Sequence, residues 1–253
     1  MQEGNANTPL ISVSISESSI AAVESKMTSV IKGTLDSGAG RASIAAQAAL
    51  YHLQSGGNRT RARFCLHACV CLGVSNNDAL ILSACVELLH NASLIHDDLQ
   101  DQEKTRHGIS SVWSRFSPAI AICAGDLLIS GAYALLASIS NVRLLPSLMA
   151  ATHQCVSRAI HGQCDDLDCT DLSQTPFETY ARIVKLKSGA LLSLPLELAL
   201  IASENFISLN HARKAAEDFS VGYQIADDLL DIEQDSATGQ KPASLNIFFV
   251  IQN

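Results

Sequence analysis

The chain has 253 residues, of which 47% are hydrophobic, 17% charged and only 5% aromatic. This length and composition exclude a chain that is disordered by default, and they favour helices over sheets. The formal net charge of −8 argues against a nucleic-acid partner, because phosphate binding needs clustered Lys and Arg. The eight cysteines lack the paired spacing of a zinc site, so we expect buried thiols.

Helix-like segments follow one another along most of the chain. Residues 1–18 are polar and expected to be flexible, 19–242 are expected to form a single helical domain, and 243–253 form a divergent tail. No β-hairpin is expected, and no apolar stretch approaches the roughly 20 residues that cross a bilayer. The prediction is an all-α antiparallel bundle in a cytoplasmic protein without a membrane span.

The segment 81–101 is the most informative part of the chain. It predicts one helix, because apolar side chains recur at the helical period and form a packing stripe of Ile81, Cys85, Leu88, Ala92 and Ile95. The polar side chains are expected on the opposite face, which carries Glu87, His90, Asp97, Asp98 and Asp101. The helix should therefore have one packing face and one acidic face.

A second segment, 222–232, repeats this arrangement. Its predicted apolar stripe is Ile225, Leu229 and Ile232, and its polar face carries Gln224, Asp227, Asp228 and Asp231. Both clusters have the spacing Asp-Asp-x-x-Asp. Carboxylates four residues apart on a helix repel each other, so a cation should compensate them. Magnesium suits such oxygen ligands and shares its remaining positions with water and phosphate, so two facing clusters could clamp a diphosphate.

These motifs occur in an order that resembles the trans-isoprenyl diphosphate synthases, the family of farnesyl and geranylgeranyl diphosphate synthases. HDDLQD at 96–101, followed by RHG at 106–108, resembles the first aspartate-rich motif of the family, and YQIADDLLD at 223–231 resembles the second. Between them, AGDLL, GQCDDLD and KLKSGALL resemble the connecting motifs. The resemblance implies a helix bundle of the isoprenoid-synthase type around a central cavity, and a homodimer. It stops after Lys241, so we expect a chain truncated at its C-terminus.

The resemblance also implies a reaction. In the family, an allylic prenyl diphosphate ionises with the help of three magnesium ions, and isopentenyl diphosphate attacks the cation head to tail and then loses a proton. The implied metal ligands are Asp97, Asp101 and Asp227, and the shells would be completed through water by Asp98, Asp228 and Asp231. Charge on the departing diphosphate would be neutralised by Arg106, Lys187 and Lys241.

The implied site for the second substrate departs from the family pattern. Its expected residues are Arg59, Arg61, Arg63 and His90. Gln163 and Gln224 are expected instead at the first site, as partners of the metal ligands or as helix residues bonded to the backbone. However, Asn58, Ala62 and His107 stand where the family has Lys, Pro and Arg. Asp165 is expected to be a solvated bystander. Two other functions therefore stay open: a class I terpene synthase that uses one prenyl diphosphate, and a non-catalytic partner that regulates an intact synthase.

The length of the product is expected to depend on residues about one helical turn before Asp97. Side chains there project into the floor of the pocket. Ala92 and Ser93 are small, so we expect a geranylgeranyl or longer product, with Leu89 as a deeper stop.

Overall fold

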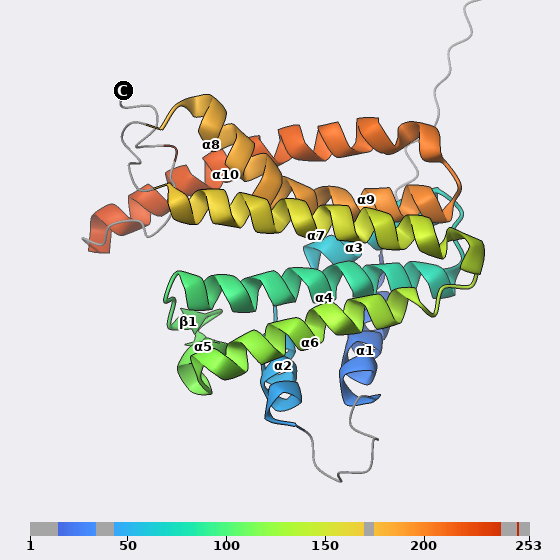
Figure 1. Ribbon diagram of the computed structural model, residues 1–253, viewed down its shortest axis with the longest axis horizontal. Helices are drawn as coiled ribbons and strands as arrows, with labels where there is room; N and C mark the ends of the chain where they lie inside the picture. Colours follow the sequence, from blue (N-terminus) through green and yellow to red (C-terminus); the bar gives the residue numbers. More distant parts are fainter. Residues whose placement is uncertain (1–14, 34–42, 170–174, 239–246, 248–253) are drawn as a thin grey trace, which may run out of the picture.

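The predicted all-α fold is confirmed in the computed structural model (Figure 1). The structure describes residues 15–33, 43–169, 175–238 and 247, and for 231–238 it describes the backbone alone. The helices of this part are α1 (Glu17–Gly33), α2 (Ile44–Gln54), α3 (Thr60–Cys71), α4 (Asn76–Gln100), α5 (Val112–Arg115), α6 (Pro118–Leu136), α7 (Leu145–Asp168), α8 (Phe177–Val184), α9 (Ala190–Ala202) and α10 (Leu209–Thr238).

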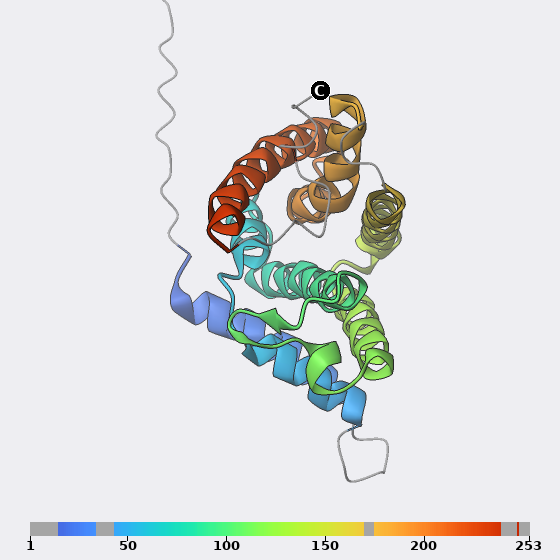
Figure 2. The ribbon, with the colours of Figure 1, turned by 90° about the vertical axis from the view of Figure 1, so that its left-hand side faces the viewer.

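Helix α4 lies at the centre of the bundle. It begins where the Ser75 hydroxyl accepts a hydrogen bond from the Asp78 amide at 3.2 Å, and it packs against α1, α3, α6 and α9. The predicted apolar stripe of α4 is buried along its whole length. Figure 2 shows α1 and α2 on one side of α4, and α7 to α10 on the other. The carboxyl end of α4 is linked to α7, because Gln163 of α7 donates to Gln100.

A short hairpin follows α4, although no hairpin was expected. Strands β1 (Thr105–Arg106) and β2 (Ile109–Ser110) are antiparallel. Their two-residue turn has positive φ at both His107 (50°) and Gly108 (78°), the backbone of a hairpin turn that matches strand twist. Histidine is uncommon at the first position of such a turn, which usually carries Asn or Asp, so the sequence pattern did not signal it.

Two helices correct the prediction about apolar stretches. By length and composition alone, α4 and α6 are each apolar enough to cross a membrane. The buried share of the apolar stretch is 72% in α4 and 44% in α6. The apolar character of α4 is thus largely that of a core helix.

The predicted boundaries are only partly within the described residues. Helix α1 already begins at Glu17 and buries Ile20 and Val23, so it starts inside the segment that was expected to be flexible. Residues 1–14 lie outside the described part. Of the tail 243–253, only Ile247 is described, and it is buried.

Candidate active site

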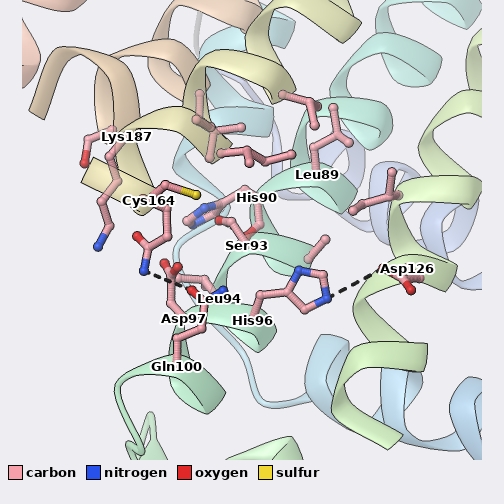
Figure 3. A pocket seen from close by; sticks show the side chains of 18 of the residues that line it. Leu89, His90, Ser93, Leu94, His96, Asp97, Gln100, Asp126, Cys164 and Lys187 are labelled. Atoms are coloured by element: carbon pink, nitrogen blue, oxygen red, sulfur yellow. Dashed lines mark hydrogen bonds and ion pairs between the residues drawn. The ribbon is translucent and has the colours of Figure 1, made fainter. Parts of the chain in front are cut away.

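A cavity of about 390 Å³ lies between α4, α6, α7 and α9. One end is polar and is lined by Asp97, Gln100, Gln163 and Lys187. The other end is apolar and is lined by Leu89, Ile129, Val156 and Leu191. Figure 3 shows Asp97, Gln100 and Lys187 grouped together, with Leu89 away from them. The cavity therefore joins a charged mouth to an apolar interior.

The mouth holds Asp97 of α4 and Lys187 from the turn before α9, and Asp101 directly follows α4 beside them. Burial raises the pKa of Asp97 to about 6, with the Lys187 charge opposing that shift and the neighbouring Asp101 adding to it. The pKa of Asp101 is raised too, chiefly by burial. The two carboxylates are one helical turn apart, so their charges accumulate at one spot.

Lys187 is held by a carboxylate that sequence reasoning missed. Its Nζ donates to Asp166 Oδ2 of α7 at 2.7 Å. Burial lowers the pKa of Lys187, but Asp166 and Asp97 outweigh burial and raise it, so the lysine is a cation at neutral pH. Asp166 is the second of two adjacent aspartates, four residues after Gly162. This spacing puts Gly162 and Asp166 on one face of α7, but the sequence does not show that this face meets the segment of Lys187.

The backbone that carries Lys187 is unusual. Residues Lys185–Gly189 form a π-helical turn between α8 and α9, a feature that frequently occurs at functional sites. Helix α7 approaches this turn closely at Gly162, where a Cβ atom would lie 2.8 Å from the carbonyl carbon of Leu186. Glycine is thus required at position 162 to bring Asp166 and Lys187 together.

Asp98 and Arg106 do not share the mouth. Asp98 is 1% exposed, and its Oδ1 accepts from Arg106 Nη2 at 2.6 Å and from Nε at 2.7 Å. Burial raises the pKa of Asp98, and Arg106 opposes that shift. The prediction that Asp98 lies on one face with Asp97 is wrong, because adjacent residues of a helix point about 100° apart. Neither Asp98 nor Arg106 lines the cavity.

Arg59 and Glu87 are also turned away from the cavity, contrary to expectation. Arg59 is 6% exposed, and it donates from Nε to Glu24 Oε1 at 2.9 Å and from Nη2 to the Leu53 carbonyl. Glu87 Oε2 accepts from the Ala62 amide at 3.0 Å. These contacts tie α1, α2, α3 and α4 together. Arg63 pairs with Glu17 on the surface at 2.8 Å.

Arg61 and His90 do reach the cavity, and they contact each other. Arg61 Nη1 lies 2.8 Å from His90 Nε2. Burial and the charge of Arg61 hold the pKa of His90 well below its usual range, so the ring is neutral and Nε2 accepts. The proton is then on Nδ1, which is buried and has no hydrogen-bond partner in the described part of the chain.

The second acidic cluster lies on α10 and is split. Asp227 is exposed, whereas Asp228 is 3% exposed and accepts from Gln224 Nε2 at 2.8 Å. Leu229 is 46% exposed, so its place in a buried stripe was predicted wrongly. The side chains of Asp231 and Ile232 and the whole of Lys241 lie outside the described residues.

The remaining predicted residues are placed as follows. Leu89, Ala92 and Ser93 all line the cavity, as does Gln163, which donates to Gln100 Oε1 at 2.9 Å. Asp165 is not a bystander, because it pairs with Arg182 of α8.

The mouth can supply two carboxylates to a metal. Among the described residues no three His, Cys, Asp or Glu side chains converge as a ready-made metal site. Magnesium commonly binds through only one or two carboxylates and takes its other ligands from water and phosphate. Asp97 and Asp101, whose pKa values are raised by burial and only partly lowered again by Lys187, fit that chemistry.

Known families, relatives and solved structures show what the chain is similar to. A family model described as polyprenyl synthetase matches residues 42–246. A geranylgeranyl pyrophosphate synthase of the chloroplast from Capsicum annuum is 29% identical over 79% of this chain and 57% of its own length. A farnesyl diphosphate synthase from Haemophilus influenzae is 32% identical over 76% of this chain and 68% of its own length.

A solved structure is similar as well. The FPP/GFPP synthase of Zymomonas mobilis has a TM-score of 0.75 at 27% identity and covers 85% of this chain and 80% of its own. The chain spans little more than half the length of the Capsicum relative. The match to the family model covers most of the chain, including both aspartate-rich motifs. The chain belongs to the polyprenyl synthetase family.

Proposed function

We propose that the chain is a magnesium-dependent prenyltransferase that condenses an allylic prenyl diphosphate with isopentenyl diphosphate. One observation carries the proposal. Asp97 and Lys187 line one cavity together with many apolar side chains, and Asp101, one helical turn after Asp97, is close enough for the Lys187 charge to act on it. A charged mouth suits a diphosphate, and an apolar interior suits a prenyl chain. Relatives named as geranylgeranyl and farnesyl diphosphate synthases support the same activity.

The side chains of the mouth divide the work on the first substrate. Asp97 and Asp101, with Asp227 from α10, would hold magnesium, which when bound stabilises the charge of the departing diphosphate as a Lewis acid. Lys187, kept cationic by Asp166, adds a fixed positive charge. The allylic C–O bond breaks with its electron pair on the diphosphate. The apolar walls keep water from the carbocation that remains.

Arg61 and His90 would orient the second substrate. The double bond of isopentenyl diphosphate attacks the cation, a new C–C bond forms, and a proton is then lost. Arg61 is the cation that reaches the cavity from α3, and the neutral His90 fixes its direction. The small Ala92 and Ser93 leave the apolar end open, which favours a geranylgeranyl or longer product.

A second candidate function rests on how few cationic side chains line the site for the second substrate. Of the four arginines Arg59, Arg61, Arg63 and Arg106, only Arg61 lines the cavity. The other three are engaged by Glu24, Glu17 and Asp98. A site that binds only one diphosphate would make the chain a class I terpene synthase.

Incubation with magnesium and farnesyl diphosphate, with and without isopentenyl diphosphate, separates these functions. We expect a longer prenyl diphosphate that forms only when both substrates are present. A hydrocarbon or alcohol made without isopentenyl diphosphate would instead indicate the terpene synthase. No turnover of either kind would leave the non-catalytic regulatory partner. The chelator EDTA should abolish either chemistry.

A further inference from the structure

The two adjacent aspartates of α10 lie in opposite environments. Asp227 is exposed, whereas the Asp228 carboxylate is buried and accepts hydrogen bonds from three described residues. Gln224 Nε2 donates to Oδ1 at 2.8 Å, and the Tyr180 hydroxyl and the Ile247 amide each donate to Oδ2 at 2.8 Å. Both oxygens of Asp228 are therefore already engaged.

The donors of these bonds come from separate parts of the chain. Tyr180 belongs to α8 and is fully buried, and Ile247 lies beyond α10. Their side chains share a small apolar cluster with Ile183 and Val184. Burial and the Asp228 carboxylate raise the pKa of Tyr180, which keeps its hydroxyl protonated as a donor. Asp228 thus joins α8, α10 and the residue at 247.

This junction adjoins the segments that carry two residues of the candidate site. Helix α8 runs directly into the π-helical turn with Lys187, so Tyr180 lies two helical turns before that lysine. Helix α10 packs on the same turn, since a Cβ at Gly189 would lie 2.8 Å from Ser220 Oγ. Asp227 is next to Asp228 and points about 100° away from it.

We propose that Asp228 is a positioning residue, which fixes the rotation of α10 and the seat of α8 and so directs Asp227 and Lys187, rather than a residue that contributes to a magnesium shell. The proposal rests on the proposed function for what Asp227 and Lys187 do. To reach a metal-bound water, Asp228 would have to give up three hydrogen bonds in a buried place. A buried donor left without its acceptor is unfavourable, so this exchange is disfavoured.

The test compares Asp228→Asn with Asp227→Asn and Tyr180→Phe in the full chain. Readouts are the midpoint of thermal unfolding, kcat, and the magnesium concentration that gives half-maximal rate. For Asp228→Asn we expect a midpoint lower by roughly 4–8 °C, because a buried charged acceptor is lost. We expect kcat to fall about tenfold or more through misplacement of Lys187 and Asp227. The magnesium requirement should rise as well, because Asp227 is misplaced, but by less than in Asp227→Asn, which removes the ligand carboxylate itself.

The matched variants give the contrast. Asp227→Asn should raise the magnesium requirement about tenfold or more and leave the unfolding midpoint unchanged, since its carboxylate is exposed. Tyr180→Phe should shift the midpoint in the same direction as Asp228→Asn but by less. Adding it to Asp228→Asn should have little further effect, because the two side chains share one bond. The Tyr180 variant also keeps the test decisive if Asp228→Asn does not fold.

Two results would overturn the positioning role. One is an Asp228→Asn protein with an unchanged midpoint and a magnesium requirement raised as much as in Asp227→Asn. The other is strict additivity of the Asp228 and Tyr180 effects on unfolding. Failure of the proposed function is a separate result. It would appear as wild-type protein without turnover and without stabilisation by magnesium plus inorganic diphosphate, while the unfolding comparison would still test the junction.

Discussion

Asp97 and Asp98 show how neighbouring carboxylates on one helix take different roles. Asp98 is buried and paired with Arg106, so its charge is compensated within the fold. Asp97 faces the cavity, where burial raises its pKa to about 6 and Lys187 only partly opposes the shift. The difference between them is the direction in which each points. The folded protein therefore holds, at the mouth of the cavity, a carboxylate whose ionised form is disfavoured by burial.

The cost of ionising Asp97 in the folded protein predicts that Asp97→Asn raises the free energy of unfolding at neutral pH. The pKa of Asp97 is about 6 in the fold and lower in the unfolded chain, so the fold gains a proton between about pH 4 and 6. The stabilisation is fully present below about pH 4 and is lost as the pH rises through 6. Without magnesium at pH 7.5, Asp97→Asn should therefore be more stable by about 1–3 kcal/mol. Prenyl transfer should be abolished.

Thermal unfolding of the two proteins at pH 4.5 and 7.5, with EDTA present, measures this effect. The difference between variant and wild type should shrink at the lower pH. Asp168→Asn, which removes an exposed carboxylate from the end of α7, is the control and should leave the unfolding midpoint unchanged. An Asp97→Asn protein that unfolds no later than wild type at pH 7.5 would contradict the prediction.

At the scale of single residues, the sequence indicated which residue types form the site better than it indicated where each side chain points. Asp97 and His90 share the predicted polar face of α4, and both line the cavity, because the helical period gives the angle between residues. It does not say which neighbouring helix covers each angle. Arg59 and Arg106 were expected at the site, but carboxylates of the fold engage them. Asp166 was overlooked because its partner Lys187 is 21 residues away.

At the scale of elements, the junction between α7 and the π-helical turn sets the position of Lys187. The buried stripe of α4 followed from periodicity, whereas this turn did not, since a π-helical turn depends on how α8 and α9 dock on their neighbours. Leu229 of α10 was predicted in a buried stripe and is exposed, because burial also depends on which helices dock on α10. The apolar period of a helix shows which face is able to pack, but the neighbouring helices determine whether that face is buried.

Gly162→Ala tests the importance of this junction. The added Cβ would meet the backbone around Leu186 and push α7 away from the turn, so the variant should lose about 1–3 kcal/mol of stability. The rate should fall as well, because Asp166 would no longer hold Lys187 in place. Gly222→Ala is the matched control, since a Cβ there meets nothing within 4 Å and α10 should tolerate it. Equal unfolding midpoints for the two variants would contradict the close-packing account.

At the scale of the whole molecule, the cavity is a product of the bundle and belongs to no single helix. The resemblance implied a central cavity whose floor lies near Ala92 and Ser93 of α4, and α6, α7 and α9 supply its other walls. Ala92 of α4 and Ala159 of α7 both line this cavity. The proposed prenyl chain would extend between them, so both small side chains should limit its length.

Ala92→Phe and Ala159→Phe should accordingly act alike, although one changes α4 and the other α7. Each aromatic ring would occupy space that the growing chain needs, so both variants should shift the products of farnesyl diphosphate and isopentenyl diphosphate towards shorter chains. Chromatography of the dephosphorylated products measures the distribution. Ala215→Phe, on the exposed side of α10, should leave it unchanged. If Ala92→Phe shortened the product and a folded Ala159→Phe did not, chain length would be set by α4 alone and not by a tube that both helices enclose.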